Sequence, residues 1–144
     1  MNPSRPIQPV KVGVIGLGRF GRLHSLTLAG LAEAELVGVV ARRHASLDNL
    51  RRELPDVRGW LDLDQAIPES GAEAWIVACS TADHVRVATK LLHAGQKVLL
   101  EKPISESGGK GLRAAARVGC SDAMSGTPDV RPTMRREMPP RLSP

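Results

Sequence analysis

The chain has 144 residues, 42% of them hydrophobic and 24% charged, with a net charge of +5; this is about one domain of ordinary globular composition. Its two cysteines are too few for a disulfide framework, no Cys/His cluster has zinc spacing, and no stretch approaches the ~18–20 apolar residues that span a bilayer. We therefore expect no metal, no membrane segment and a cytoplasmic location.

Strands and helices alternate in the hydrophobic pattern of residues 11–101. Residues 11–16 are a predicted strand, and residues 19–30 a predicted helix. One face of this helix is expected to carry Phe20, Leu23, and Leu26 or Thr27. A second strand is expected over 35–40.

The middle of the chain predicts a helix and two shorter elements. Ser46 is a suitable cap for a helix that ends before Pro55. The side chains expected to point inward from it are Leu47, Leu50 and Leu54. A short strand over 57–61 and one helical turn over 64–67 are expected to follow.

The last part of the pattern holds a buried strand over 73–79, an amphipathic helix over 84–94 that Gly95 ends, and a further strand over 97–101. Strands that alternate with helices at this spacing indicate βαβ units, a parallel sheet and right-handed crossovers. The predicted fold is therefore α/β: a Rossmann-like, doubly wound parallel sheet with helices on both faces.

The chain changes character after Ile104. Residues 105–144 hold five of the eleven prolines and no aromatic residue, and a short helix is predicted only over 110–118. Such a composition buries too little apolar surface to offset chain entropy. The predicted division is a flexible N-terminus over 1–9, a nucleotide-binding domain over 10–118, and an irregular basic tail, disordered or poorly packed, over 119–144.

A glycine-rich run, Gly16-Leu17-Gly18-Arg19-Phe20-Gly21, directly follows the apolar strand Val12-Gly13-Val14-Ile15 and opens a helix. In that context Gly16 permits a tight turn, Gly18 lets backbone approach a pyrophosphate, and Gly21 lets the helix lie close on the sheet. The free N–H groups of the helix start then face the phosphates. We predict a dinucleotide site here, against the alternative of an ordinary strand-to-helix turn.

The end of the second strand bears on cofactor choice. A fold that prefers NAD usually has an acid there, about 20 residues past the loop, on the ribose 2′-hydroxyl. This sequence has Ala41-Arg42-Arg43-His44 instead, with no carboxylate until Asp48. Two arginines can hold a 2′-phosphate by charge-assisted, forked hydrogen bonds. The predicted cofactor is NADP in preference to NAD; the alternative is that both arginines are merely solvated.

Two further strand ends carry polar residues. Ser80 and Thr81 offer hydroxyls after the fourth strand, and the neighbouring His84 is interpreted as a structural residue that bonds backbone. Cys79 is interpreted as a small core residue and not as a nucleophile. Glu101-Lys102-Pro103 ends the last strand, where an ammonium group can polarise a substrate hydroxyl or carbonyl.

Together these residues resemble the amino-terminal half of the Gfo/Idh/MocA oxidoreductase family, over about residues 10–105. The resemblance is carried by residues 12–21, the segment ending in His84, and residues 94–103. It implies a Rossmann domain that binds NAD or NADP, then a larger α+β domain that holds a sugar-like substrate and often mediates oligomerisation. The implied catalytic residue is Lys102. The implied cofactor contacts are Gly16, Leu17, Gly18, Arg19, Phe20, Gly21, Arg42, Arg43, Ser80, Thr81, His84, Glu101, Lys102 and Pro103.

The sequence departs from the family pattern in three places. Ala41 stands where many members have an acid, which agrees with NADP, and Ser80 stands where proline is common. The family's second domain, with its catalytic Asp and His, has no counterpart in residues 105–144. We expect a frameshift near residues 106–112; the alternative is a genuine stand-alone module with a basic tail.

The leading functional hypothesis is an oxidoreductase that moves hydride between a sugar or polyol and the nicotinamide. Without a substrate domain, the chain alone is expected to bind cofactor with little or no turnover. One alternative is a non-catalytic NADP-binding regulatory or partner module. Another is nucleic-acid binding by the arginine-rich end of the chain; residues 105–144 have seven basic and four acidic residues but no aromatic side chain for stacking. We expect a small-molecule partner, no nucleic acid, and a homo-oligomer as one option.

Overall fold

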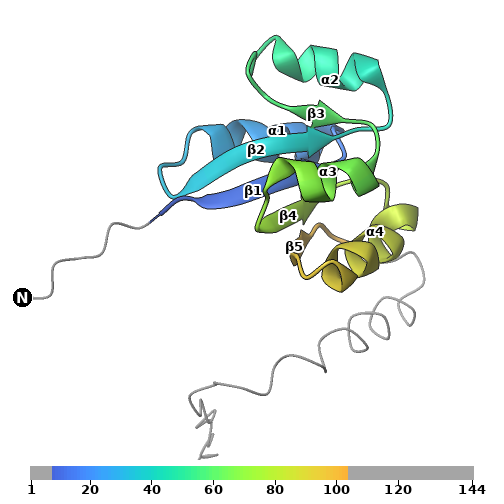
Figure 1. Ribbon diagram of the computed structural model, residues 1–144. Helices are drawn as coiled ribbons and strands as arrows, with labels where there is room; N and C mark the ends of the chain where they lie inside the picture. Colours follow the sequence, from blue (N-terminus) through green and yellow to red (C-terminus); the bar gives the residue numbers. More distant parts are fainter. Residues whose placement is uncertain (1–7, 104–144) are drawn as a thin grey trace, which may run out of the picture.

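Five parallel strands form one sheet, in the order β3-β2-β1-β4-β5, in the computed structural model, which describes residues 8–103 (Figure 1). The strands are β1 (Val10–Ile15), β2 (Ala34–Val40), β3 (Gly59–Trp60), β4 (Ala74–Val77) and β5 (Lys97–Leu100). The helices of the described residues are α1 (Arg19–Ala29), α2 (His44–Arg51), α3 (Leu63–Ser70) and α4 (Thr81–His93). The predicted doubly wound α/β sheet is confirmed.

Helices cover both faces of the sheet, and each face has its own apolar core. Helices α1 and α2 contribute Leu28, Leu47 and Leu50 to one core cluster. Helices α3 and α4 contribute Ala66 and Leu91 to the other. Figure 1 shows α3 and α4 in front of the sheet and α1 behind it. This arrangement leaves the carboxyl ends of the strands as the edge at which loops gather.

The two tryptophans of the chain pack against glycines of neighbouring strands. Trp75 of β4 is paired with Gly13 of β1, and a Cβ atom on Gly13 would overlap the indole. Trp60 lies in the same way against Gly38 of β2. Each indole N–H donates to a side-chain oxygen, at 3.1 Å for Trp75 and 2.8 Å for Trp60. Large rings thus fill one face of a sheet whose other core residues are small or aliphatic.

Helix α1 approaches the sheet through small residues. Phe20 and Leu23, the predicted apolar face, are 58% and 57% exposed, whereas Gly21, Ser25 and Leu28 are buried. A Cβ atom on Gly21 would overlap the carbonyl oxygen of the preceding turn. The close approach of the helix therefore selects small side chains where it first meets the sheet, and Phe20 and Leu23 point outward while Leu28 enters the core.

Three helices begin earlier or run longer than the sequence predicts. Helix α2 begins at His44, before the predicted cap Ser46, and α4 begins three residues before the predicted start at residue 84. Helix α3 has eight residues where one turn was predicted. The side chain of Asp62 caps its start, and the helix continues past Pro68 to Ser70.

The chain ends were predicted as a flexible segment over 1–9, a helix over 110–118 and a tail over 119–144. Apart from residues 8 and 9, these segments lie outside the described residues. Within residues 8–103, no helix is both long enough and apolar enough to cross a membrane.

Gly13→Ala is expected to lower the free energy of unfolding by about 1–3 kcal/mol, because the added methyl group overlaps the fully buried indole of Trp75. Urea denaturation followed by far-UV circular dichroism measures the change. Gly30→Ala is the matched control, because its nearest neighbour would lie at an ordinary 3.6 Å; we expect a change within about 1 kcal/mol. Equal losses in the two variants would contradict the packing described.

Candidate functional site

The carboxyl ends of four strands lie at one level of the sheet. Ile15 pairs with Val40 on one side and with Val77 on the other, and Val77 pairs with Leu100. The strand order reverses between β1 and β4, since β2 and β3 lie on one side of β1 and β4 and β5 on the other. Ligands of doubly wound sheets bind at this switch point.

A groove of about 770 Å³ lies at the switch point. Eight of the predicted cofactor residues line it: Gly16, Leu17, Gly18, Arg19, Phe20, Arg42, Arg43 and Ser80. Six predicted residues are absent from its lining: Gly21, Thr81, His84, Glu101, Lys102 and Pro103. The structure therefore brings the glycine loop, the arginine pair and the β4 loop together, while the predicted catalytic segment stands at the end of the next strand.

The glycine loop divides into two packed glycines and one open glycine. Gly16 has φ +88°, and a Cβ atom there would lie 2.6 Å from backbone atoms of Ala78 and Cys79. Gly21 is equally confined, whereas Gly18 has nothing within 4 Å of its Cβ position. No side chain caps α1, whose first N–H groups have no partner within the helix. The loop thus leaves space and unpaired backbone donors where an anion binds.

Two cations and no acid stand at the end of β2. Arg42 and Arg43 both line the groove, and the Arg42 side chain is 81% exposed. Asp48, the first carboxylate after β2, lies 3.5 Å from Arg51 and is absent from the groove lining. The end of β2 therefore brings two positive charges to the groove, whose carboxylates come from other segments: Asp62, Asp64 and Asp83.

Asp83, in the first turn of α4, is a groove residue that sequence reasoning missed. Its carboxylate accepts hydrogen bonds from Arg86 at 2.8 Å and from the Ser80 hydroxyl at 2.7 Å, and Arg42 lies 4.0 Å away. The hydrogen bonds from Arg86 and then Ser80 hold the pKa of Asp83 below its usual range. Ser80 and Arg86 lie three residues before and after Asp83, and this spacing is the sequence signal that could have indicated the two contacts.

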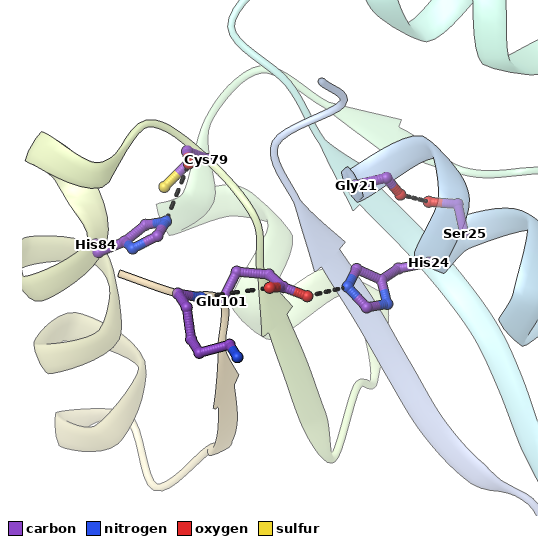
Figure 2. A network of polar contacts seen from close by, with 7 residues as sticks. Gly21, His24, Ser25, Cys79, His84 and Glu101 are labelled. Carbon is purple, nitrogen blue, oxygen red and sulfur yellow. Dashed lines mark hydrogen bonds and ion pairs between the residues drawn. The ribbon is translucent and has the colours of Figure 1, made fainter. Parts of the chain in front are cut away.

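His84 contacts the backbone just after two strands, β4 and β5. The imidazole is buried, with Nε2 3.0 Å from the carbonyl oxygen of Cys79 (Figure 2) and Nδ1 2.9 Å from that of Pro103. These contacts match its interpretation as a structural residue that bonds backbone. Burial, and then the charge of Asp83, raises the pKa of the Cys79 thiol, which favours the unreactive neutral form.

The Glu101-Lys102-Pro103 segment is anchored on both sides of its lysine. The Glu101 carboxylate pairs with Nε2 of His24 on α1 (Figure 2), and the Glu101 N–H donates to Val77 at 3.0 Å. The hydrogen bond from His24 lowers the pKa of Glu101. Lys102 is exposed, and its peptide bond to Pro103 is cis. Sequence reasoning missed His24, because its partner lies 77 residues away and no local spacing indicates the contact.

Across residues 8–103, no group of three or more His, Cys, Asp or Glu side chains is placed to hold a metal ion.

The family follows from comparison with known sequences. A family model described as "Oxidoreductase family, NAD-binding Rossmann fold" (GFO_IDH_MocA) matches residues 10–121. The chain belongs to the Gfo/Idh/MocA oxidoreductase family. The resemblance stated from the sequence is thereby confirmed, and the domain with the groove is the NAD-binding Rossmann domain of this family.

Named family members similar to this chain include inositol dehydrogenases. The myo-inositol 2-dehydrogenase of Thermotoga maritima is 29% identical over 96 residues, which cover 67% of this chain and 29% of the relative. The structure of GenD2 from gentamicin A biosynthesis in complex with NAD has a TM-score of 0.69 at 28% identity, covering 81% of this chain and 34% of that one. The structure of the Lactobacillus casei scyllo-inositol dehydrogenase with NAD(H) and scyllo-inositol has a TM-score of 0.67 at 26% identity. The match covers 77% of this chain and 32% of that one. The chain spans about a third of the length of these relatives.

Glu101→Gln is expected to weaken the acid sensitivity of the fold. The pKa of Glu101 is lowered in the folded chain, so its pairing with His24 stabilises the fold above the ordinary carboxyl pKa and is lost as pH falls through the lowered value. Thermal midpoints taken between about pH 7 and about pH 3 should therefore fall less in the variant than in the parent. Glu33→Gln, in the α1–β2 loop, is the control; a parallel fall in all three chains would refute the pairing.

Proposed function

We propose that the residues lining the groove bind NADP in preference to NAD. We also propose that the domain that holds the groove is the cofactor domain of an oxidoreductase that acts on a sugar or polyol. The observation that carries the cofactor proposal is the pair Arg42 and Arg43, which face the groove where no carboxylate lines the end of β2. Guanidinium groups hold a phosphate by forked, charge-assisted hydrogen bonds. Two similar solved structures hold NAD or NAD(H), so NADP preference is a property proposed for this chain from its own residues.

The glycine loop is proposed to hold the pyrophosphate. The residues fit such a group, since Gly18 leaves open space and the start of α1 offers uncapped N–H donors. Gly21, although outside the groove lining, sets the approach of α1 and therefore the direction of those donors. When bound, the nicotinamide supplies hydride transfer; the protein binds and orients it.

Lys102 is proposed to polarise the oxygen of the substrate at the reacting carbon. An ammonium group placed there stabilises an alkoxide as it develops. The contacts of Glu101 with His24 and of Pro103 with His84 fix the backbone on both sides of the lysine. This arrangement leaves the lysine side chain exposed at the carboxyl end of β5 while its backbone is held.

Substrate and assembly are proposed from the family. The sugar or polyol class follows from relatives named inositol dehydrogenases, and a homo-oligomer follows from the family resemblance. The cytoplasmic location expected from cysteine usage stays a prediction.

Calorimetric titration of the 144-residue chain is expected to show tighter binding of NADP than of NAD. Combining Arg42→Gln with Arg43→Gln should reduce the ratio of NADP to NAD affinity by about tenfold or more, because hydrogen bonds to charged groups contribute about 1.5–3 kcal/mol each. Arg51→Gln with Arg52→Gln removes the same charge from residues outside the groove and should leave the ratio unchanged. Tighter binding of NAD by the parent chain would overturn the cofactor proposal.

Polyol oxidation by the same chain is expected to be undetectable even at saturating cofactor. Among the described residues, the carboxylate next to Lys102 is that of Glu101, and it is paired with His24. We therefore expect it to serve no general acid–base role, and such groups contribute about 10²–10⁴-fold to these rates. Reduced-cofactor absorbance with myo-inositol as substrate measures the rate. Turnover that Lys102→Met abolishes would contradict this expectation.

A further inference from the structure

Asp83 connects the two sides of the groove. It stands in the first turn of α4, and its Oδ2 lies 4.0 Å from a guanidinium nitrogen of Arg42, which follows β2 on the opposite side of β1. All three partners of its carboxylate line the same groove: Ser80, Arg42 and Arg86. A carboxylate therefore faces Arg42 from across the groove.

The three partners contact the Asp83 carboxylate at different distances. Ser80 and Arg86 donate to separate oxygens of Asp83 at 2.7 Å and 2.8 Å, whereas Arg42 remains at 4.0 Å with its side chain 81% exposed. Departure of Arg42 would leave the Asp83 carboxylate with a bond on each oxygen. Arg42 can consequently move to another anion without leaving an unpaired carboxylate behind, which is the costly outcome when a charge pair is broken.

We propose that Asp83 is a specificity-determining residue that restrains the preference for a 2′-phosphorylated cofactor by competing with that phosphate for Arg42. The inference rests on the proposed function, in which Arg42 contacts the 2′-phosphate. A cofactor without that phosphate leaves the contact between Arg42 and Asp83 in place. A phosphorylated cofactor must displace the carboxylate from Arg42, so part of its charge attraction is offset.

Two other cations of the groove, Lys90 and Arg86, make different contacts from those of Arg42. Lys90 is held by Asp64 at 2.5 Å, away from Asp83. Arg86 bonds Asp83 directly, so removing the carboxylate also releases Arg86 toward the groove. An experiment must therefore separate an effect that passes through Arg42 from one that passes through Arg86, and a double-mutant cycle does so.

The test is the ratio of NADP to NAD affinity, measured by calorimetry on the full chain, for the parent, Asp83→Asn, Arg42→Gln and the double variant. Asp83→Asn should shift the ratio toward NADP by about two- to five-fold, the size expected for an exposed ion pair. In the Arg42→Gln background the same substitution should shift it by about 1.5-fold or less. Asp83→Ser, which also removes the charge, should act in the same direction. Asp56→Asn, outside the groove, is the control and should leave the ratio at the parent value.

Three results would overturn the inference. These are an unchanged ratio in Asp83→Asn, a shift toward NAD, and a shift of full size that persists without Arg42. The first two show that no competition exists, and the third shows that Asp83 acts through Arg86 or directly on the cofactor. A different result would contradict the proposed function itself: NADP affinity that is unchanged in Arg42→Gln alone. The inference about Asp83 would then fail together with the proposed function.

Discussion

The close passage of Gly16 beside the backbone of Ala78 and Cys79 is the constraint on which the site depends. A side chain at Gly16 would lie 2.6 Å from those backbone atoms. The same turn brings α1 so near that Gly21 has no room for a Cβ atom. Because the turn is this tight, the uncapped start of α1 stands directly over the place where the strand order reverses. The groove, its open Gly18 and its backbone donors all follow from that approach.

Two histidines, one buried and one half-buried, connect helices α1 and α4 to the loops that follow the strands. His24 reaches from α1 to Glu101, and His84 reaches from α4 to Pro103 and Cys79. The predicted catalytic lysine therefore stands on a backbone segment that is tied to helices on both faces of the sheet. Positional accuracy at such a residue matters, since catalysis depends on geometry within fractions of an ångström.

Much of this arrangement could be predicted from local pattern. The alternation of apolar strands with helices fixed the layers, and the glycine spacing behind Ile15 located the switch point. Properties decided by close tertiary contact could not be predicted: Phe20 and Leu23 point outward because α1 contacts the sheet through Gly21 and Ser25. Helix α3 is longer than predicted and continues past Pro68, although proline is unfavourable inside a helix. His24 was missed because its partner lies 77 residues away. Asp83 was missed although its two hydrogen-bond partners, Ser80 and Arg86, lie only three residues away.

The packing of both tryptophans on one face has a spectroscopic consequence. Trp60 and Trp75 belong to the core that α3 and α4 cover, and the chain has no tyrosine. Intrinsic ultraviolet fluorescence therefore reports on that layer alone. The core of the layer under α1 and α2 is aliphatic and holds no tryptophan. Loosening of that layer would therefore register in a backbone probe such as far-UV circular dichroism but not in tryptophan fluorescence.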